Sequence, residues 1–559
     1  MTYYEMKHLN CHNTTILIGN PGCGKTTYLI ADLEKRVKQG IPLHQIGFWS
    51  FSNAAVDEAS QRARMALTPP EQSQKPLVSL NALSEKSSTE NSQEQLDLPY
   101  FRTLHSMAFQ LLNLSQDNLM TDSNLEEFGN LHNYKFNQSV RANGHQSRLT
   151  EFDKALQAIN TARLLDVNIK DYLIKNNKGL PVAPIERMAE EYENYKLVKG
   201  VFDYTDMLVL AKTADIEFPH LKIAYIDEAQ DLATLLWVLA DRQAEFCDEI
   251  IIAGDDKQSI NKFSGADVDT FLHLPGKVQS LEQSYRVPNK IWSLANRIVD
   301  RHMVNYRKEG ANWKPRDEEG TLLPIDCPPY RNILNGESWL ILARANYQLE
   351  PIAKDLINGC REAVPFTING SAPVEIGIFE SIIYLNECHK KGLNPAEDLL
   401  VFKNNDSAAA IRKKSAKIAM LKRYMTPANC GVSEQPLEIT EQFKRACGKD
   451  WRLALDKLPI GTLNYVQKLL PEYMEKGSAL FRDSNIKLMS IHSAKGREAD
   501  NVMLLLDAPR AVSETIQGYN KFEDDTEAKV VYVAVTRARK RLYTWKYNKR
   551  NVGLDYFFK

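Results

Sequence analysis

The feature that most constrains this chain is a glycine-rich loop between a short apolar segment and an amphipathic one. Residues 14–18 read TTILI, residues 19–27 read GNPGCGKTT, and residues 28–40 read YLIADLEKRVKQG. The first segment predicts a buried strand, and the last predicts a helix that ends at a glycine. A strand, the pattern GxxxxGK followed by Ser or Thr, and a helix together form a phosphate-binding unit. The chain is therefore expected to contain an α/β domain built around a phosphate site.

This loop supplies most of the expected nucleotide-binding residues. Its glycines let backbone N–H groups curve around a polyphosphate, and the following helix adds the positive end of its dipole. Lys25 is expected to hold the β- and γ-phosphates, and Thr26 to offer its hydroxyl to Mg²⁺. A glycine-rich turn without a ligand is the alternative, which the flanking segments disfavour. The predicted nucleotide-binding residues of the loop are Gly19, Asn20, Pro21, Gly22, Cys23, Gly24, Lys25, Thr26 and Thr27.

Two later segments end in polar residues that suit the same chemistry. Residues 221–226, LKIAYI, predict a strand that runs into DEAQD. Asp227 is expected to hold Mg²⁺, and Glu228 to orient and deprotonate the attacking water. A solvated turn is the alternative for this acidic end. Residues 249–267, EIIIAGDDKQSINKFSGAD, predict a further strand, with Gln258 able to reach a γ-phosphate and Phe263 as either a core residue or a base-stacking platform.

Composition narrows the class of protein without identifying a partner. The chain has 559 residues, of which 43% are hydrophobic and 25% are charged, as in a globular protein of several domains. Its formal net charge of −1 does not by itself indicate a nucleic-acid partner. We see no signal peptide and no bilayer-spanning apolar run, so we expect a cytoplasmic protein without a membrane partner. The eight cysteines form no CxxC pair and are expected to be free thiols.

Further segments occur between and after these motifs, in a definite order along the chain. They are FSNAAVDEA (51–59), YFRTLHSMAFQLL (100–112), FDYTDML (202–208), LEQSYR (281–286), LMSIHSAKGREADNV (488–502) and VVYVAVTRARKRL (530–542). Together with the phosphate loop and the two polar strand ends, these segments resemble the motifs of the UvrD/Rep family of superfamily 1 helicases. The resemblance runs from residue 14 to residue 542 and therefore covers nearly the whole chain.

The resemblance implies roles for individual residues. The implied catalytic residues are Lys25, Glu228, Gln258, Arg286 and Arg537, with the two arginines reaching the γ-phosphate from the second motor domain. Guanidinium groups suit that task because they neutralise a transferring phosphoryl group bidentately. Tyr285 is expected to stack on adenine, and Glu498, beside Gly496, to lie near the ribose.

A second set of residues is expected to line the path of a single strand: Phe51, Asn53, Thr103, His105, Phe263 and His492. An ordinary core position is the alternative for the aromatic residues and the histidines. Some positions depart from the family pattern. The segment EMKHLNCHNTT lacks the family's adenine-contacting Gln, for which Asn10 or His12 could substitute. Asn261, Ser264, Arg497 and Ala499 differ from the residues that are usual in the DNA motifs.

The resemblance also implies two RecA-like parallel-sheet motor domains, each with a mainly helical insertion. The first is expected to comprise 1–105 and 197–279, with an insertion at 106–196. The second is expected to comprise 280–373 and 484–559, with an insertion at 374–483. Residues 68–98 are polar and predict a flexible surface loop. Basic clusters occur at 411–423 and 537–550; we hypothesise that the first contacts duplex DNA, and a solvated face is the alternative for each.

The implied function is an ATP- and Mg²⁺-dependent motor on single-stranded DNA that unwinds duplex at single-strand/duplex junctions. The family resemblance implies 3′-to-5′ travel, a role in repair or replication, and ATP bound between the two motor cores. One alternative is an ATP-hydrolysing DNA-sensing or assembly subunit with little unwinding of its own. Such a subunit would work beside a nuclease or another replication, repair or defence protein. An RNA motor is a further alternative.

Overall fold

The computed structural model describes two compact units. The described residues are 6–9, 12–51, 53–67, 97–137, 150–176, 180–310, 312–333, 335–358, 363–390, 408–424, 455–518, 525–548 and 550–559. Unit 1 comprises Met1–Gly320, Gly518–Arg539 and Phe557–Lys559, and unit 2 comprises Thr321–Gln517 and Lys540–Tyr556. Most of the predicted loop at 68–98 and Asn10 lie outside the described residues.

Unit 1 is built on a six-stranded sheet with the order β3-β2-β4-β5-β1-β6, in which every pairing is parallel. Parallel sheets are covered on both faces, which explains why these strands read as nearly continuous apolar runs. The strands are β1 (Thr14–Gly19), β2 (Ile46–Ser50), β3 (Phe101–Thr103), β4 (Leu221–Asp227), β5 (Cys247–Gly254) and β6 (Lys277–Leu281).

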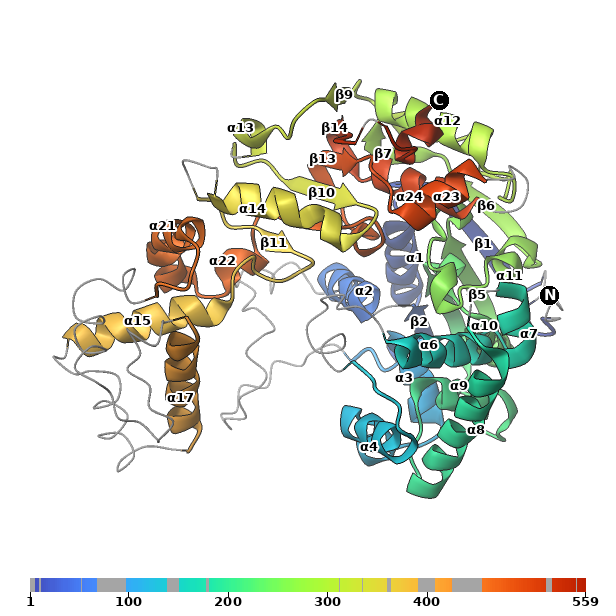
Figure 1. Ribbon diagram of the computed structural model, residues 1–559. Coiled ribbons are helices and arrows are strands. Elements are labelled where there is room, and N and C mark those ends of the chain that lie inside the picture. The colour runs from blue at the N-terminus through green and yellow to red at the C-terminus, as the bar shows by residue number, and fades with distance from the viewer. Residues whose placement is uncertain are drawn as a thin grey trace. The chain divides into compact units, whose positions relative to one another are not determined.

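Helices cover both faces of this sheet (Figure 1). Leu17 belongs to the core on the side of α1 (Lys25–Lys38) and α2 (Asn53–Leu67). Its neighbours Ile16 and Ile18 belong to the core on the opposite side. That side is covered by α3 (Leu104–Leu111), α9 (Tyr204–Thr213) and α10 (Thr234–Ala244). The alternation follows from the two-residue period of a strand, and it fixes the register of β1 between the two layers.

Unit 1 also contains segments that the sequence analysis assigns to the second motor domain. These are β7 (Gln283–Pro288), α12 (Asn289–His302), β8 (Lys314–Arg316) and α24 (Thr526–Val535). The helix α11 (Val268–His273), which precedes β6, lies within the predicted first motor domain. The tip of β5 is tied to the chain that follows α12, because the Arg307 N–H donates to Asp256 Oδ2 at 3.1 Å. The domain boundaries given above stay predictions.

A separate group of helices in unit 1 has a core of its own around Phe128, which is fully buried. The group consists of α4 (Asp122–His132), α6 (Glu151–Leu164), α7 (Ile169–Asn176) and α8 (Val182–Lys199). Thr121 and Thr150 cap the first helices of this group with their side chains, and Gly200 ends α8 in the left-handed conformation. The predicted helical insertion at 106–196 overlaps this group.

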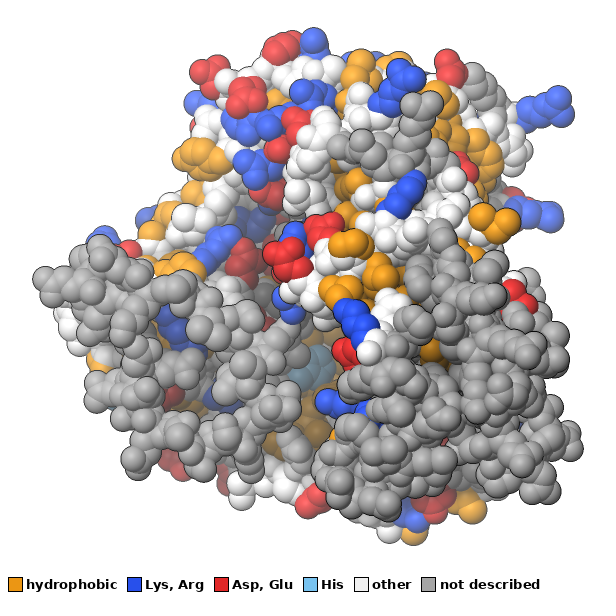
Figure 2. Space-filling model, turned by 90° about the vertical axis from the view of Figure 1, so that its left-hand side faces the viewer, with side chains coloured by type: hydrophobic (Ala, Val, Ile, Leu, Met, Phe, Trp, Pro, Cys, Tyr) orange, Lys and Arg blue, Asp and Glu red, His pale blue; other side chains and the backbone are white. Residues whose placement is uncertain are grey.

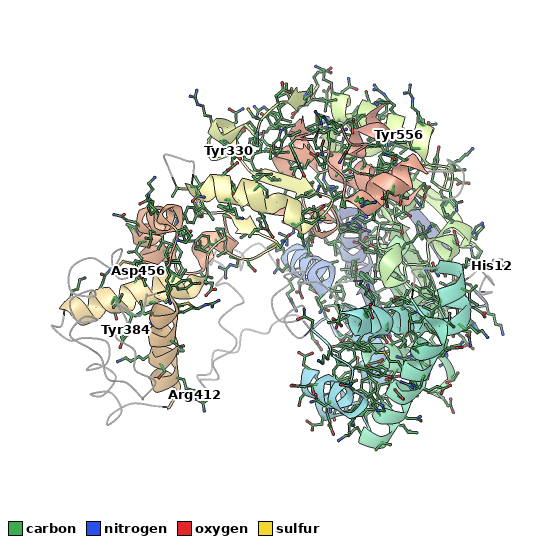
Figure 3. The ribbon with its side chains drawn as sticks, in the orientation of Figure 1. His12, Tyr330, Tyr384, Arg412, Asp456 and Tyr556 are labelled. Carbon is green, nitrogen blue, oxygen red and sulfur yellow. The ribbon has the colours of Figure 1, made fainter. Side chains whose placement is uncertain are left out.

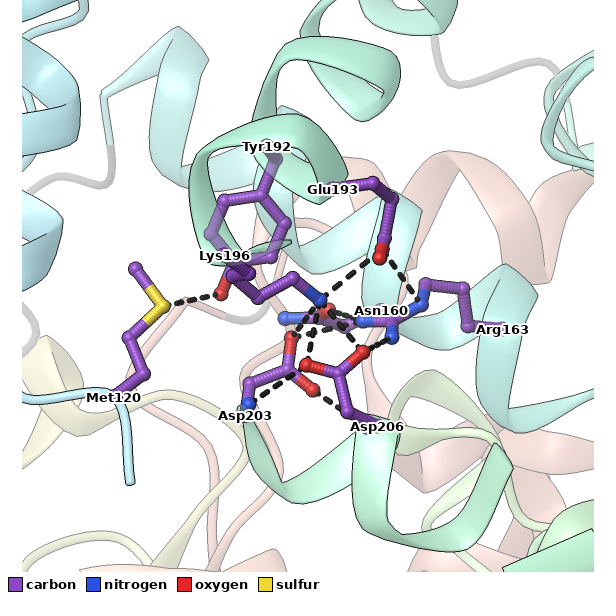
Figure 4. A network of polar contacts seen from close by, with 8 residues as sticks. All are labelled: Met120, Asn160, Arg163, Tyr192, Glu193, Lys196, Asp203 and Asp206. Carbon is purple, nitrogen blue, oxygen red and sulfur yellow. Dashed lines mark hydrogen bonds and ion pairs between the residues drawn. The ribbon is translucent and has the colours of Figure 1, made fainter. Parts of the chain in front are cut away.

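A charged network joins these helices to α9 (Figure 4). Lys196 Nζ, 3% exposed, lies 2.7 Å from Asp206 Oδ1 and 3.1 Å from Asp203 Oδ2. Arg163 pairs with the same two carboxylates and with Glu193. Burial by itself would raise the pKa of Asp203, but the charges of Arg163 and Lys196 outweigh it and lower that pKa to about 2. Asp203 is therefore ionised at neutral pH, as a buried ion pair requires.

Unit 2 contains the second six-stranded sheet, with the order β11-β12-β10-β13-β14-β9. Its strands are β9 (Thr321–Ile325), β10 (Trp339–Ala343), β11 (Thr367–Ile368), β12 (Ile486–Ser490), β13 (Ala499–Leu505) and β14 (Ala538–Trp545). Its helices are α13 (Tyr330–Ile333), α14 (Glu350–Asn358), α15 (Ile376–Lys390), α17 (Ala408–Arg423), α21 (Ile460–Lys476), α22 (Ala479–Arg482) and α23 (Arg510–Gln517).

Two parallel-sheet α/β cores are thus present, which confirms the predicted fold class. No helix in the described part of the chain is both long enough and apolar enough to cross a bilayer.

The buried network predicts a measurable loss of stability. Replacing Lys196 with Met leaves Asp203, Asp206 and Glu193 with one cation instead of two. We expect the free energy of unfolding, measured by urea unfolding, to fall by about 3 kcal/mol. Lys199→Met is the matched control, because Lys199 lies on the same helix and pairs with Glu127 at the surface. That control should change stability by less than about 1 kcal/mol, and equal losses in the two variants would contradict the assignment.

Candidate functional site

The candidate site gathers at one edge of the unit 1 sheet. Gly19, Ser50, Thr103, Asp227 and Gly254 are the last residues of five strands that all run in the same direction. The carboxyl ends of parallel strands meet at the same edge, where open α/β sheets bind their ligands. The predicted phosphate loop, acidic strand end and polar strand tip therefore lie next to one another.

The phosphate loop has the backbone that the glycines predict. Gly22 has φ 74° and Gly24 has φ 76°, both in the left-handed region that favours glycine. A Cβ added at Gly22 would lie 2.3 Å from Arg286 Cβ, so the loop approaches β7 too closely for any other residue. Lys25 opens α1 and is buried, with Nζ donating to the Gly19 carbonyl at 2.9 Å. This places its ammonium group over the loop.

The thiol of Cys23 in this loop has a packing role. Cys23 is 4% exposed, and burial raises the pKa of its thiol to about 12. A protonated, buried thiol is a weak nucleophile and behaves as a small apolar group. Cys23, Cys247 and Cys327 are free cysteines, in agreement with the expectation for those three.

Thr26 and Asp227 provide two oxygen donors side by side. Thr26 Oγ1 donates to Asp227 Oδ2 at 2.5 Å. Burial, and next the charge of Glu228, raise the pKa of Asp227 to about 6, while Thr26 and Lys25 act in the opposite direction. A hydroxyl and a carboxylate are ligands that Mg²⁺ prefers when phosphate oxygens and water complete its octahedron. The described residues contain no cluster of three or more His, Cys, Asp or Glu side chains that could hold a metal alone.

Glu228 follows Asp227 in an unusual backbone conformation. Its φ of 54° is left-handed, which costs a residue other than glycine roughly 1 kcal/mol or more. Its N–H donates to Asp227 Oδ1 at 2.9 Å, and its carboxylate oxygen Oε2 accepts a hydrogen bond of 2.5 Å from Gln230 Nε2. The Glu228 side chain is partly buried, so its carboxylate remains accessible to a water molecule that it could deprotonate.

Gln258 and Arg537 contact each other directly. Gln258 Nε2 donates to Asp255 Oδ2 at 2.8 Å, and Gln258 Oε1 accepts a 2.6 Å bond from Arg537 Nη2. Arg537 is 1% exposed and follows α24, where its Nε donates to the Val533 carbonyl. Two residues that the sequence analysis assigns to the γ-phosphate are thus neighbours within unit 1.

Tyr285 and Arg286 lie on β7, which is bonded to the phosphate loop. The Tyr285 N–H donates to the Gly22 carbonyl at 2.8 Å, and Ser284 Oγ donates to the Pro21 carbonyl at 2.7 Å. The Tyr285 ring is 71% exposed, so a face is available for stacking. Both predicted arginine fingers therefore belong to the same compact unit as Lys25, whereas the sequence analysis places them in a second motor domain.

The predicted ribose and strand residues of unit 2 lie in one loop. His492 opens the short turn η9 (His492–Ala494), Gly496 has φ 78°, and Glu498 is exposed just before β13. Their roles toward the ribose and the strand stay predictions.

The predicted strand-contact residues of unit 1 have varied surroundings. Phe51 packs partly against the core, and exposed Asn53 begins α2. Thr103 caps α3, because its Oγ1 accepts a hydrogen bond from the Ser106 N–H at 3.2 Å, which is a structural role. Burial lowers the pKa of His105 to about 4, so its ring is neutral at physiological pH. Phe263 lies in η7 (Lys262–Ser264), and its side chain lies outside the described part of the chain.

The structure adds two residues that the sequence analysis did not single out. Tyr204, the first residue of α9, is 66% exposed, and its ring makes an edge contact with His105 at a centroid distance of 6.4 Å. Gln230 is fully buried between the ends of β4 and β5. Both belong to quoted motifs, so their position in FDYTDML and DEAQD is the signal that could have marked them.

The sequence matches models of known helicase domains. Residues 4–279 match the model of the UvrD/REP helicase N-terminal domain, and residues 400–549 match that of the UvrD-like helicase C-terminal domain. DNA helicase II of Rickettsia typhi is 21% identical over 97% of this chain and 91% of its own length. The putative ATP-dependent DNA helicase YjcD of Bacillus subtilis is 23% identical over 79% of this chain and 67% of its own length.

A solved arterivirus helicase covers 98% of this chain and 62% of its own, at 9% identity and a TM-score of 0.33, which is too low to support an inference. The two family models cover the predicted motifs in the same order along the chain. The first includes the phosphate loop, the acidic strand end and Gln258, and the second includes His492 and Arg537. The chain therefore belongs to the UvrD/Rep-like family of helicases.

Proposed function

We propose that this protein is an ATP-dependent DNA helicase that moves 3′ to 5′ along single-stranded DNA and opens duplex at single-strand/duplex junctions. The observation that carries the proposal is the meeting of Lys25, Thr26, Asp227, Glu228 and Gln258 at one sheet edge in a chain of this family. A cytoplasmic location and a role in replication or repair are parts of the same proposal.

The residues divide the work of hydrolysis among them. Lys25 would neutralise the β- and γ-phosphates, and Thr26 and Asp227 would hold Mg²⁺, which supplies further charge neutralisation when bound. Glu228 would orient the attacking water and accept its proton. Gln258, Arg286 and Arg537 would compensate the charge that develops on the γ-phosphoryl group. Tyr285 would stack on the base.

Aromatic side chains and Lys or Arg side chains would bind the single-stranded DNA. The exposed Tyr204 ring makes an edge contact with His105, and its free face could stack on a base, since every base has a π-face. Because His105 is neutral, it would support the Tyr204 ring and would not contribute charge. Lys and Arg side chains are interspersed with Asp and Glu side chains on the described part of the face in Figure 2. Binding of DNA phosphates would therefore depend on the local positions of the cations and not on the net charge.

The test of the whole proposal is ATP hydrolysis with and without single-stranded DNA, followed by strand displacement from duplexes with 3′ or 5′ tails. We expect hydrolysis to be stimulated by DNA and unwinding to require a 3′ tail. Glu228→Gln is the control, and it should lower both activities by at least about 100-fold because the general base is lost. Strong hydrolysis without displacement would favour the DNA-sensing subunit, and equal stimulation by single-stranded RNA would favour an RNA motor.

The phosphate loop has a test of its own. Lys25→Ala removes the ammonium group expected on the β- and γ-phosphates, so we expect ATP hydrolysis to fall by at least about 100-fold. Binding of a single-stranded oligonucleotide, measured by fluorescence anisotropy, should change by less than about threefold, since Lys25 is buried and offers little surface to DNA phosphates. Near-normal turnover would refute the assignment of this loop.

The basic helix α17 is tested through the salt dependence of duplex binding. Arg412 and Lys413 are exposed, Arg412 lies near the N-terminal end of the helix (Figure 3), and Lys417 lies over the Tyr384 ring at 5.8 Å. If the exposed pair contacts duplex phosphates, replacing both residues with Glu should weaken duplex binding and reduce the salt slope by about 2. The matched control is the double variant Arg331→Glu and Lys354→Glu, because these two residues are also exposed and also lie in unit 2. If the salt dependence of duplex binding is unchanged in the α17 variant, the basic side chains of α17 only face solvent.

A further inference from the structure

Gln230 joins the two strand ends that carry the proposed hydrolytic groups. It is the second residue of η5 (Ala229–Asp231), two residues after Glu228, and its side chain is fully buried. Its Nε2 donates to Glu228 Oε2 at 2.5 Å, and its Oε1 accepts the Asp255 N–H at 2.9 Å. One amide group therefore connects the end of β4 with the end of β5.

The surroundings determine which way this amide faces. A backbone N–H at Asp255 can only donate, so it requires the oxygen of the amide, and the Glu228 carboxylate then meets the NH₂ group. The backbone carbonyl of Gln230 accepts a hydrogen bond from Ser259 Oγ at 3.1 Å. A Cβ at Gly254 would lie 2.8 Å from Gln230 Oε1, so the glycine permits this close approach. Gln230 is thus held at its backbone and at both ends of its amide.

The same strand end carries the γ-phosphate candidates. Asp255 Oδ2 accepts a hydrogen bond of 2.8 Å from Gln258 Nε2, and Gln258 Oε1 accepts one of 2.6 Å from Arg537 Nη2. A continuous series of contacts therefore runs from Glu228 through Gln230, Asp255 and Gln258 to Arg537. Glu228 is only partly buried, and Gln230 supplies a fixed side-chain donor to its carboxylate. A general base must be held within hydrogen-bond reach of the water it deprotonates, and small misplacement is costly.

We infer that Gln230 is a positioning residue for hydrolysis, which holds the Glu228 carboxylate in register with the strand end that bears Gln258. This inference rests on the proposed role of Glu228 as the general base. Gln230 would not touch the nucleotide, so its loss should lower the rate of the chemical step and leave nucleotide binding intact.

The first test compares two buried glutamines of unit 1. Gln230→Leu removes both hydrogen bonds of the amide, and we expect kcat for DNA-stimulated ATP hydrolysis to fall by about 10- to 100-fold while KM for ATP stays within about threefold. Gln243→Leu is the matched control. Gln243 is also fully buried, donates to the Pro219 carbonyl at 2.8 Å, and lies beside Cys247 at the opposite end of β5. The control should lower the thermal midpoint similarly and leave kcat within about twofold.

A second variant keeps the volume of the side chain and removes the hydrogen bonds of the amide. Gln230→Met is similar in length to Gln but has no donor for the Glu228 carboxylate. We expect a kcat as low as that of Gln230→Leu, with a smaller loss of thermal midpoint because the side chain fills the same space. A normal kcat in a folded Gln230→Met protein would overturn the inference, even if Gln230→Leu fails to fold.

A double-mutant cycle shows whether Gln230 acts through Glu228. In single-turnover hydrolysis, adding Gln230→Leu to Glu228→Gln should lower the rate by less than about twofold, because the positioned group is already gone. A full additional loss in the double variant would overturn the inference. If Glu228→Gln itself hydrolyses ATP normally, the proposed role of Glu228 fails. If Glu228→Gln strongly lowers the rate but Gln230→Leu has the same kcat as Gln243→Leu, only the positioning role of Gln230 fails.

Discussion

The common direction of the strands in unit 1 is the constraint on which the candidate site depends. Because β1, β2, β3, β4 and β5 all run the same way, their carboxyl ends bring together segments that are far apart in the sequence. Thr26 and Asp227, whose side chains are 2.5 Å apart, are separated by 201 residues. The sheet is covered by helices on both faces, so its edge is where polar side chains can gather without disturbing the core.

Buried charge at the end of β5 is the second requirement. Asp255 and Asp256 are fully buried and Lys257 is 1% exposed, an arrangement that is stable only when the charges are compensated. Lys257 Nζ lies 3.5 Å from Asp255 Oδ1 and over the Tyr306 ring, while Asp256 accepts the Arg307 N–H. These contacts fix the strand end that presents Gln258.

Much of this arrangement is predictable from local sequence. The strand expected at residues 14–18 is observed as Thr14–Gly19, and the one expected at 221–226 as Leu221–Asp227. Apolar runs followed by glycine or acidic residues define such elements within a few residues of chain. The grouping of β7 and α24 with the phosphate loop is different, because it depends on contacts between segments hundreds of residues apart. Thr103 shows a further limit, since a motif residue can serve as a helix cap.

The sequence alone determined the phosphate loop, the acidic strand end, the α/β class and the family, because each is expressed in short spacings and in motif order. Only the tertiary structure decided which side chains meet. Arg537 bonds to Gln258 across 279 residues, and Gln230 reaches both Glu228 and the Asp255 N–H. Such pairings arise when folding buries polar groups that must find partners, and the identity of those partners is a property of the packed chain and not of any segment.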